Sequence, residues 1–343
     1  MLTAKVELIA LNRSLGDGLL VEITKALREL RDGEFLALTG SSPDLKAELE
    51  QWSQLTGHSI VEIAEIQEGA NRYVIRKGVA PRYEDSHVLG ERLWIYTNFD
   101  CNLSCDYCCV RSSPLTPRRA LGIEEITRLI SEAVELGFKR VFMTGGEPFI
   151  LPDIAQIINA SSRSLPTTVL TNGMLFTGSR LKALEGLSRD GVTLQISLDS
   201  PTPEVHDLHR GPGSWAKALA GITRARELGF RVRVAATALT QQQLSVMDEF
   251  LESQQIPPQD RVLRLVALRG NAKTGLALAR PELVPELTVT SQGVYWHPVG
   301  ATDDDFLISR QLSPLSAALE QARQMLTEDG ALLNRLAQIF NCA

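Results

Sequence analysis

An alternation of strand-like and helix-like segments, repeated from residue 92 to residue 267, constrains the fold of this 343-residue chain more than any other feature. Short apolar runs recur, and amphipathic segments of helical periodicity fill most of the gaps between them. Parallel strands need a crossover of a dozen or more residues between them, so this spacing predicts a parallel sheet. The expected strands cover residues 93–96, 140–143, 167–170, 193–197, 231–236 and 262–267.

Polar motifs directly follow several of these strands, which is where barrel enzymes build their sites. We therefore expect fold class α/β, with a partial (β/α)6 TIM-type barrel over residues 92–272 rather than a doubly wound sheet. The helices expected between the strands cover residues 123–136, 154–161, 180–188, 214–228 and 242–252.

Two further regions flank the barrel. Residues 1–78 have the order βαβαββ, which predicts a small two-layer sandwich domain, and the polar segment 79–91 is the expected linker. Residues 273–343 hold a proline-rich connection, a short hairpin near 287–297 and a long final helix within 313–340.

The composition is that of an ordinary soluble protein, with 44% hydrophobic and 22% charged residues. Thirty-five basic against 41 acidic residues give a net charge of −6, which disfavours a surface that tracks nucleic-acid phosphates. No apolar run reaches the ~18 residues of a membrane span. The first fifteen residues also lack the apolar core of a signal peptide. We therefore expect a cytoplasmic protein with neither nucleic acid nor membrane as a partner.

Three cysteines lie within eight residues, directly after the first barrel-type strand: Cys101, Cys105 and Cys108. Clustered thiols in a reducing compartment are metal ligands or redox groups more often than disulfides. Three thiolates can hold three irons of a cubane and leave the fourth iron open, and an open coordination site is typical of a catalytic metal. The alternative is a structural zinc site, which would need a fourth ligand such as Cys342 or a histidine. The neighbouring Cys109 is expected to be unligated.

The CxxxCxxC spacing, with aromatic Tyr107 before the last cysteine, resembles the radical S-adenosylmethionine (radical SAM) superfamily. Thr144-Gly145-Gly146-Glu147-Pro148, after the second strand, resembles the GGEP motif, which in that family binds the amino group of SAM. Glycines let the backbone approach a ligand, and the Glu147 carboxylate can pair with an ammonium group. The resemblance implies one [4Fe–4S] cluster on the three cysteines and S-adenosylmethionine as cofactors.

Further matches follow in the family's order. Thr171-Asn172-Gly173 closes the third strand, and Ser197-Leu198-Asp199-Ser200 closes the fourth, where family members place contacts to the ribose and carboxylate of SAM. His206-Asp207-Leu208-His209-Arg210-Gly211 resembles the HD-x-x-RG signature of radical SAM peptide and cofactor maturases, with Arg210 as a candidate partner of the SAM carboxylate. The alternative for His206 and Asp207 is a helix-start cap and a satisfied surface histidine.

Thr237 and Leu268, after the fifth and sixth strands, either flank adenine or are ordinary core or turn residues. Arg269-Gly270-Asn271-Ala272 resembles the Gly-Arg-Ala turn of the same subgroup. The full set of residues expected to bind SAM is Tyr107, Gly145, Gly146, Glu147, Pro148, Asn172, Ser197, Asp199, Arg210, Thr237 and Leu268.

Residues 287–298 resemble the hairpin of a SPASM or twitch domain, in which cysteines bind auxiliary iron–sulfur clusters. No cysteine lies between Cys109 and Cys342, so this segment lacks the full cysteine set, and we expect a degenerate twitch without a cluster. For His297, a packed or surface position is favoured over a role as a substitute ligand.

Residues 1–78 resemble the sulfur-carrier TusA family through their element order, the Thr24-Lys25-Ala26-Leu27 helix, Gly33-Glu34 and Trp52…Gly57-His58. Gly16 and Asp17 stand where that family has its persulfide-carrying Cys-Pro pair. Sulfur relay needs a thiolate. We therefore expect this domain to dock a peptide or carrier-protein substrate instead.

The resemblance implies an enzyme whose cluster is reduced by an external donor such as a flavodoxin or ferredoxin. SAM would be cleaved reductively to a 5′-deoxyadenosyl radical, which abstracts hydrogen from substrate. The maturase-like features favour a ribosomal peptide or a peptide-derived cofactor precursor as that substrate. One alternative is a radical SAM enzyme of small-molecule sulfur, haem or molybdenum-cofactor metabolism. The other is a non-catalytic Fe–S adaptor.

Overall fold

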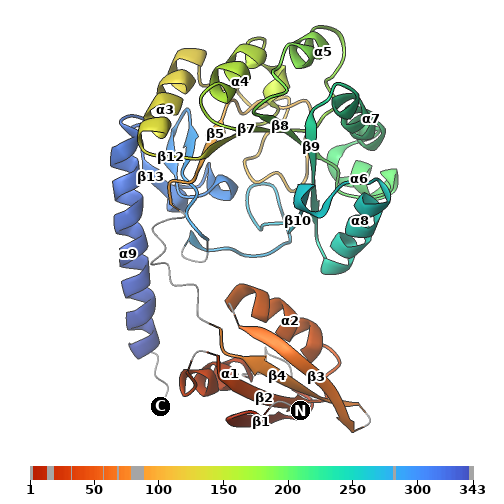
Figure 1. Cartoon of the computed structure of the whole chain (residues 1–343), viewed down its shortest axis with the longest axis vertical. Coiled ribbons are helices and arrows are strands. Elements are labelled where there is room, and N and C mark those ends of the chain that lie inside the picture. The colour runs from red at the N-terminus through yellow and green to blue at the C-terminus, as the bar shows by residue number, and fades with distance from the viewer. Residues whose placement is uncertain are drawn as a thin grey trace. The chain divides into compact units, whose positions relative to one another are not determined.

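The computed structural model in Figure 1 describes residues 3–13, 19–31, 33–56, 58–67, 69–78, 89–280 and 283–339. Several residues named in the sequence predictions lie outside these ranges: Gly16, Asp17, most of the expected linker and Cys342. The chain divides into two compact units, Met1–Glu84 and Asp85–Ala343, and each is described by itself.

The first unit confirms the predicted βαβαββ order. Its elements are β1 (Val6–Ala10), α1 (Leu19–Arg28), β2 (Phe35–Gly40), α2 (Leu45–Thr56), β3 (Ser59–Gln67) and β4 (Ala70–Arg76). The sheet order is β1-β2-β4-β3, with β1 parallel to β2 and the other pairs antiparallel. The two helices bury their apolar stripes, including Leu19, Ile23, Leu45 and Leu49, against the sheet residues Leu36, Leu38 and Tyr73. This small core is separate from that of the second unit.

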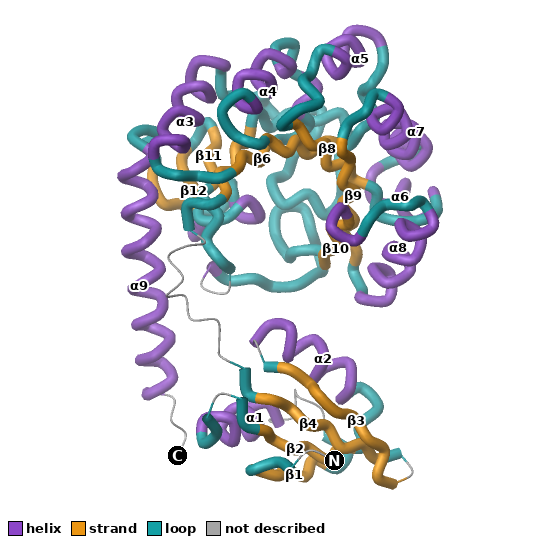
Figure 2. The backbone as a smooth tube through the Cα atoms, in the orientation of Figure 1, coloured by secondary structure: helices purple, strands orange, loops and turns teal. Residues whose placement is uncertain are grey.

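The second unit confirms the predicted partial barrel. Six parallel strands stand in sequence order: β5 (Arg92–Tyr96), β6 (Arg140–Thr144), β7 (Thr167–Thr171), β8 (Val192–Ser197), β9 (Arg231–Ala238) and β10 (Arg261–Leu265). The helices between them are α3 (Ile123–Glu135), α4 (Ile154–Ser162), α5 (Gly178–Glu185), α6 (Pro203–Arg210), α7 (Ser214–Glu227) and α8 (Gln241–Ser253). Figure 2 shows these helices around the outside of a curved, open sheet.

Alternation along the strands divides the side chains between two environments. Residues such as Leu93, Ile95, Val141 and Met143 join the helices in the main hydrophobic core. The residues between them face the interior of the curved sheet, and the loops after the strands meet at one end of it. The fold therefore gathers segments that are far apart in the sequence.

The hairpin expected near residues 287–297 is present, since β11 (Thr288–Thr290) pairs in antiparallel fashion with the strand that follows it. The prediction did not include the parallel pairing of β11 with β5, which extends the barrel sheet. β12 (Gly293–Tyr295) and β13 (Leu307–Ser309) follow in antiparallel pairing. The unpaired edge of β5 explains this addition, because the Trp94 amide donates to the Leu287 carbonyl at 2.9 Å. The final helix, α9, covers Leu315–Ile339.

Helix α6 was not predicted. It has only eight residues, begins at Pro203 and ends before Gly211 at φ +103°, so it shows little of the periodicity from which helices are recognised. Within the described part of the chain, no helix is both long and apolar enough to cross a membrane.

Candidate active site

The loop after β5 carries the three predicted cluster ligands. Cys101 is buried, and Cys105 and Cys108 are half-buried free thiols. Backbone amides point at two of the sulfurs: Leu103 N lies 3.4 Å from Cys101 Sγ, and Ser112 N lies 3.3 Å from Cys108 Sγ. Such amides stabilise thiolate charge, so the loop suits anionic sulfur ligands.

Burial raises the pKa of the Cys101 thiol to about 12 and also raises the pKa of Cys105. Metal binding therefore has to displace their protons. Among the described residues, no three His, Cys, Asp or Glu side chains converge on a point suited to a single metal ion. A cubane places its cysteine sulfurs on different irons, so it does not need that convergence. Three thiols, two of them facing backbone amides, are a donor set that fits an iron–sulfur cluster.

The turn that follows β10 packs directly on the cysteine loop. Gly270 has φ +64°, and a Cβ on it would lie 2.1 Å from the Cys108 carbonyl oxygen. The Asn271 backbone amide donates to that same carbonyl at 3.0 Å, and its side-chain Nδ2 donates to the Cys105 carbonyl at 3.3 Å. Two of the predicted ligand residues are thus held by one turn.

Arg269 anchors this turn to the segment after β12. Its guanidinium pairs with Asp303 at 2.9 Å and with Asp305 at 3.1 Å, and it lies over the Phe306 ring. The segment without auxiliary cysteines therefore supports the loop that carries the cluster ligands.

Gly145 and Gly146 pack against the residues that lead into the cysteine loop. A Cβ on Gly146 would lie 2.2 Å from the Asp100 carbonyl oxygen, and one on Gly145 would lie 2.6 Å from Asn98 Oδ1. The Gly146 amide donates to the Asn98 carbonyl at 3.0 Å. We expected these glycines to admit a ligand, and the structure gives them a second reason, which is close contact between two backbone segments.

The Glu147 carboxylate is fully buried at the end of β6. It accepts hydrogen bonds from Thr171 Oγ1 at 2.7 Å, from the Asn172 amide at 2.7 Å and from the Phe149 amide at 3.0 Å. Burial raises its pKa, although the bonds from Asn172 and Thr171 oppose that rise. The carboxylate ties β6 to the end of β7. Its pairing with the SAM ammonium group stays a prediction.

Asn172 extends this connection to the cysteine loop. Its side-chain Nδ2 donates to Asn102 Oδ1 at 2.8 Å, and its Oδ1 accepts from the Met174 amide at 3.0 Å. Asn102 was not predicted to take part, and its place inside the cysteine spacer was the signal that could have identified it.

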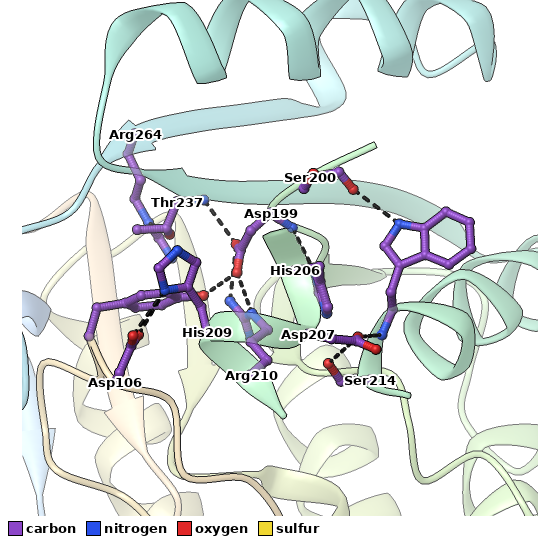
Figure 3. Close-up of polar contacts among 12 residues, drawn as sticks. Asp106, Asp199, Ser200, His206, Asp207, His209, Arg210, Ser214, Thr237 and Arg264 are labelled. Carbon is purple, nitrogen blue, oxygen red and sulfur yellow. Dashed lines mark hydrogen bonds and ion pairs between the residues drawn. The ribbon is translucent and has the colours of Figure 1, made fainter. Parts of the chain in front are cut away.

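Asp199, after β8, is the centre of a second set of contacts (Figure 3). Its carboxylate accepts from the Arg210 guanidinium, from the Tyr107 hydroxyl and from the Thr237 amide, the last at 3.0 Å. Burial alone would raise the pKa of Asp199, but Arg210 holds it below the usual value. In spite of its own burial, the pKa of Arg210 is raised well above its ordinary value by Asp199. The two groups form a buried ion pair.

This set brings together four predicted SAM contacts from four segments. Tyr107 comes from the cysteine loop, Asp199 from the loop after β8, Arg210 from α6 and Thr237 from β9. Arg210 was expected to meet the SAM carboxylate, whereas here it already pairs with Asp199.

Two further residues of the HD-x-x-RG segment, His206 and Asp207, hold the local structure. His206 is buried, and its Nδ1 accepts from the Asp199 amide at 3.1 Å. Burial, followed by the charge of Arg210, lowers its pKa to about 4, so it is neutral. Asp207 accepts from the Gly213 amide at 2.6 Å and the Trp215 amide at 2.7 Å, which caps the start of α7. The alternative reading of Asp207 as a cap is the one that the structure shows.

A cavity of about 360 Å³ opens beside the Asp199 ion pair. Tyr107, Asp199 and Thr237 are among its polar lining residues, and Val205, Leu239 and Val246 contribute to a surface that is largely apolar. Its size lies within the usual range for a small-molecule site. Leu268 lies outside it and is 43% exposed, and Ser197 is half-buried at the end of β8 without lining it.

Two further polar residues complete the barrel mouth. Arg264, which was not predicted, is exposed on β10 and donates through Nε to Thr237 Oγ1 at 3.2 Å. His297 accepts from the Val299 amide at 3.2 Å. Burial, followed by the charge of Arg264, lowers the pKa of His297 to about 4. This is the packed histidine that we expected.

Comparisons with known proteins agree with this geometry. Residues 95–252 match the family described as Radical SAM superfamily, and residues 18–77 match the family described as Sulfurtransferase TusA. Molybdenum cofactor biosynthesis protein 1 of Drosophila melanogaster is 33% identical over 179 residues, which cover 50% of this chain and 31% of that protein. The AdoMet-dependent heme synthase of Methanosarcina barkeri is 33% identical over 140 residues, which cover 40% of this chain and 39% of that protein.

The solved structure of anSMEcpe with bound AdoMet has a similar fold. Its TM-score is 0.52 at 13% sequence identity, covering 68% of this chain and 82% of that one. The chain spans less than half the length of the two curated relatives described above. Two segments of the chain are thus similar to known families: residues 18–77 to TusA, and residues 95–252, less than half of the chain, to the Radical SAM superfamily.

Proposed function

We propose that the radical SAM domain of this chain is catalytic and cleaves S-adenosylmethionine reductively at a [4Fe–4S] cluster. The observation that supports this most is convergence at one end of the sheet. The cysteine loop, the Gly145–Pro148 turn, Asn172 and the Asp199–Arg210 pair all meet there, although they span more than 100 residues of sequence.

Cys101, Cys105 and Cys108 would hold three irons of the cluster. When bound and reduced, the cluster supplies the electron that splits SAM into methionine and a hydrogen-abstracting 5′-deoxyadenosyl radical. The protein contributes binding, orientation and exclusion of water.

The 360 Å³ cavity suits the adenosine half of SAM, because it offers apolar surface with a few polar groups. Tyr107 and Thr237 would contact that half. Their hydrogen bonds to Asp199 fix their positions before any ligand arrives. Glu147 would act on the amino group of SAM from a carboxylate that three protein donors already hold in place.

The substrate is proposed in two forms. A ribosomal peptide or peptide-derived cofactor precursor is favoured by the HD-x-x-RG segment and the twitch-like hairpin, with residues 1–78 docking it. A small molecule of haem or molybdenum-cofactor metabolism is favoured by the relatives of 33% identity, an AdoMet-dependent heme synthase and a molybdenum cofactor biosynthesis protein.

The first experiment is anaerobic reconstitution with iron and sulfide, reduction with dithionite, addition of SAM and chromatography for 5′-deoxyadenosine. We expect the product to form, to be lost in Cys105→Ala and to persist in the matched control Cys109→Ala. A complete cluster that yields no 5′-deoxyadenosine, even with candidate substrates present, would favour the adaptor instead.

A second measurement separates the substrate classes. The full chain is incubated with SAM and deuterated candidates, and deuterium in 5′-deoxyadenosine is read by mass spectrometry. Transfer from a peptide encoded beside the gene supports the first form. Transfer only from a tetrapyrrole or purine nucleotide supports the second.

A further inference from the structure

The segment Arg111–Arg119, called the 111–119 loop below, is in hydrogen-bond contact with two predicted cluster ligands. Its Ser112 amide donates to Cys108 Sγ at 3.3 Å, and its Ser113 carbonyl accepts from the Cys101 amide at 3.2 Å. Ser113 also forms a parallel β-bridge with Asp100. This loop therefore connects the protein surface, through these hydrogen bonds and its own backbone, to the cysteines that are predicted to hold the cluster.

The loop presents one leucine to solvent on an ordered turn. Leu115 is 94% exposed. On either side of it, the Leu115 amide donates to Ser113 Oγ at 3.2 Å, the Thr116 amide donates to the Ser113 carbonyl at 3.1 Å, and Thr116 Oγ1 donates to the Arg111 carbonyl at 3.0 Å. An exposed apolar residue by itself is ordinary, but these bonds fix the backbone that carries this one and leave its side chain uncovered.

The outward charge of the loop is positive, although the whole chain has a net charge of −6. Its charged residues are three arginines, with no acidic residue among them. Arg118 pairs with Asp100 at 2.9 Å and Arg111 pairs with Asp303 at 3.5 Å. The arginine side chains are 52% and 55% exposed, whereas the two carboxylates are 15% and 16% exposed, so an approaching molecule meets the guanidinium groups first.

One margin of this surface is acidic. Asp304 is 89% exposed and pairs with Arg310 at 2.9 Å, and Asp305 is 57% exposed and pairs with Arg269 at 3.1 Å. Both line the same hollow as Arg111, so the positive surface ends at these two carboxylates.

We propose that the 111–119 loop docks the protein that reduces the cluster, and that this partner is an acidic, low-potential one-electron carrier. The inference rests on the proposed function, because only a cluster that turns over needs such a donor. One electron passes from the reduced carrier, which is oxidised, to the cluster, which goes from the 2+ to the 1+ state, and no bond is made or broken. Electron-transfer partners bind through small, transient interfaces, in which complementary charge speeds the encounter.

The test compares two reductants on the same variant. Leu115→Asp is assayed for 5′-deoxyadenosine with dithionite, a small molecule, and with reduced flavodoxin kept reduced by its reductase and NADPH. We expect the flavodoxin-driven rate to fall about tenfold, since a charge of the partner's own sign replaces an apolar contact. The dithionite-driven rate should stay within about twofold of the parent, since small surface substitutions leave the fold intact.

Two further variants make the comparison specific. Leu11→Asp, at a 60% exposed leucine of the first unit, adds the same charge elsewhere and should leave both rates unchanged. Asp304→Asn removes one of the two carboxylates at the acidic margin and should raise the flavodoxin-driven rate. Added salt should lower that rate in the parent, because it screens the attraction.

The outcomes separate this inference from the proposed function. A parent that makes no 5′-deoxyadenosine with dithionite contradicts the proposed function. A parent active with dithionite but not with flavodoxin overturns the docking proposal, as does a Leu115→Asp variant whose two rates match those of the parent.

Discussion

At the scale of single residues, the buried carboxylates of the site are already occupied by protein donors. Glu147 receives three hydrogen bonds, and Asp199 holds Arg210, Tyr107 and the Thr237 amide. The sequence predicts the chemical type of these residues and their positions at strand ends. It does not predict which groups donate to them, because all of these donors except the Phe149 amide lie 11 to 92 residues away in the sequence, and only the folded sheet brings them together.

The buried His206 predicts a dependence of stability on pH. Its pKa is about 4 in the folded chain against about 6.5 when unfolded, so between these values the unfolded state binds a proton that the native state does not. Acidification from pH 6.5 to pH 4 should therefore lower the free energy of unfolding of the second unit, by about 3 kcal/mol for this group. Urea denaturation of the apoprotein across this range measures the effect.

His206→Asn is the matched variant, since its amide oxygen can still accept from the Asp199 amide. The free energy of unfolding of this variant should differ from that of the parent at every pH. It should also depend less on pH between 4 and 6.5. A slope identical to that of the parent would show that another group causes the acid sensitivity.

At the scale of elements, periodicity predicts the six barrel strands and five of the helices between them within a few residues. It fails at α6 and β13, which have eight and three residues, and at the pairing of β11 with β5. Elements this short bury too few apolar positions to show a period, and their form depends on partners elsewhere, such as the edge of β5. The turn at Gly270 was expected, but its contact with the cysteine loop could not be predicted, because the backbone it packs on lies about 160 residues earlier.

Replacement of Gly270 tests how this turn supports the cysteine loop. A Cβ there would meet the Cys108 carbonyl oxygen at 2.1 Å, so Gly270→Ala has to move the loop. We expect about half or less of the parent's iron after reconstitution, and an altered electron paramagnetic resonance spectrum of the reduced cluster, because ligand positions tolerate little displacement.

Gly229→Ala is the control, since Gly229 also has positive φ, at +82°, but no atom within 4 Å of the added Cβ. This variant introduces the strain of a non-glycine residue at positive φ, but its new Cβ meets no other atom. Equal iron content and equal spectra in the two variants would show that strain alone accounts for any change, and that the contact with Cys108 does not position the loop.

At the scale of the whole molecule, the chain has two compact units with separate hydrophobic cores. Composition and the change of element order predict this division. The docking role of the first unit stays a prediction, since Gly16 and Asp17, which stand where the TusA family has its Cys-Pro pair, lie outside the described residues.

Separate cores predict separate responses to core substitutions. Leu38 in the first unit and Leu194 in the second are both fully buried. Each leucine-to-alanine change should cost about 2–5 kcal/mol in its own unit. Calorimetric unfolding should show Leu38→Ala lowering one transition and Leu194→Ala lowering the other. A single transition that both variants lower equally would mean that the two units unfold together.

The pairing of β11 with β5 has a consequence for how the chain is made. β5 ends at Tyr96, and the strand that covers its outer edge begins at Thr288, so a ribosome must add some 190 residues before that edge is paired. During this interval the barrel's first strand presents unpaired amides and carbonyls to other nascent chains. Truncation before Thr288 should leave the same edge permanently open and yield aggregated protein. The segment that begins at β11 therefore pairs with, and so covers, the edge of a strand that the ribosome made about 190 residues earlier.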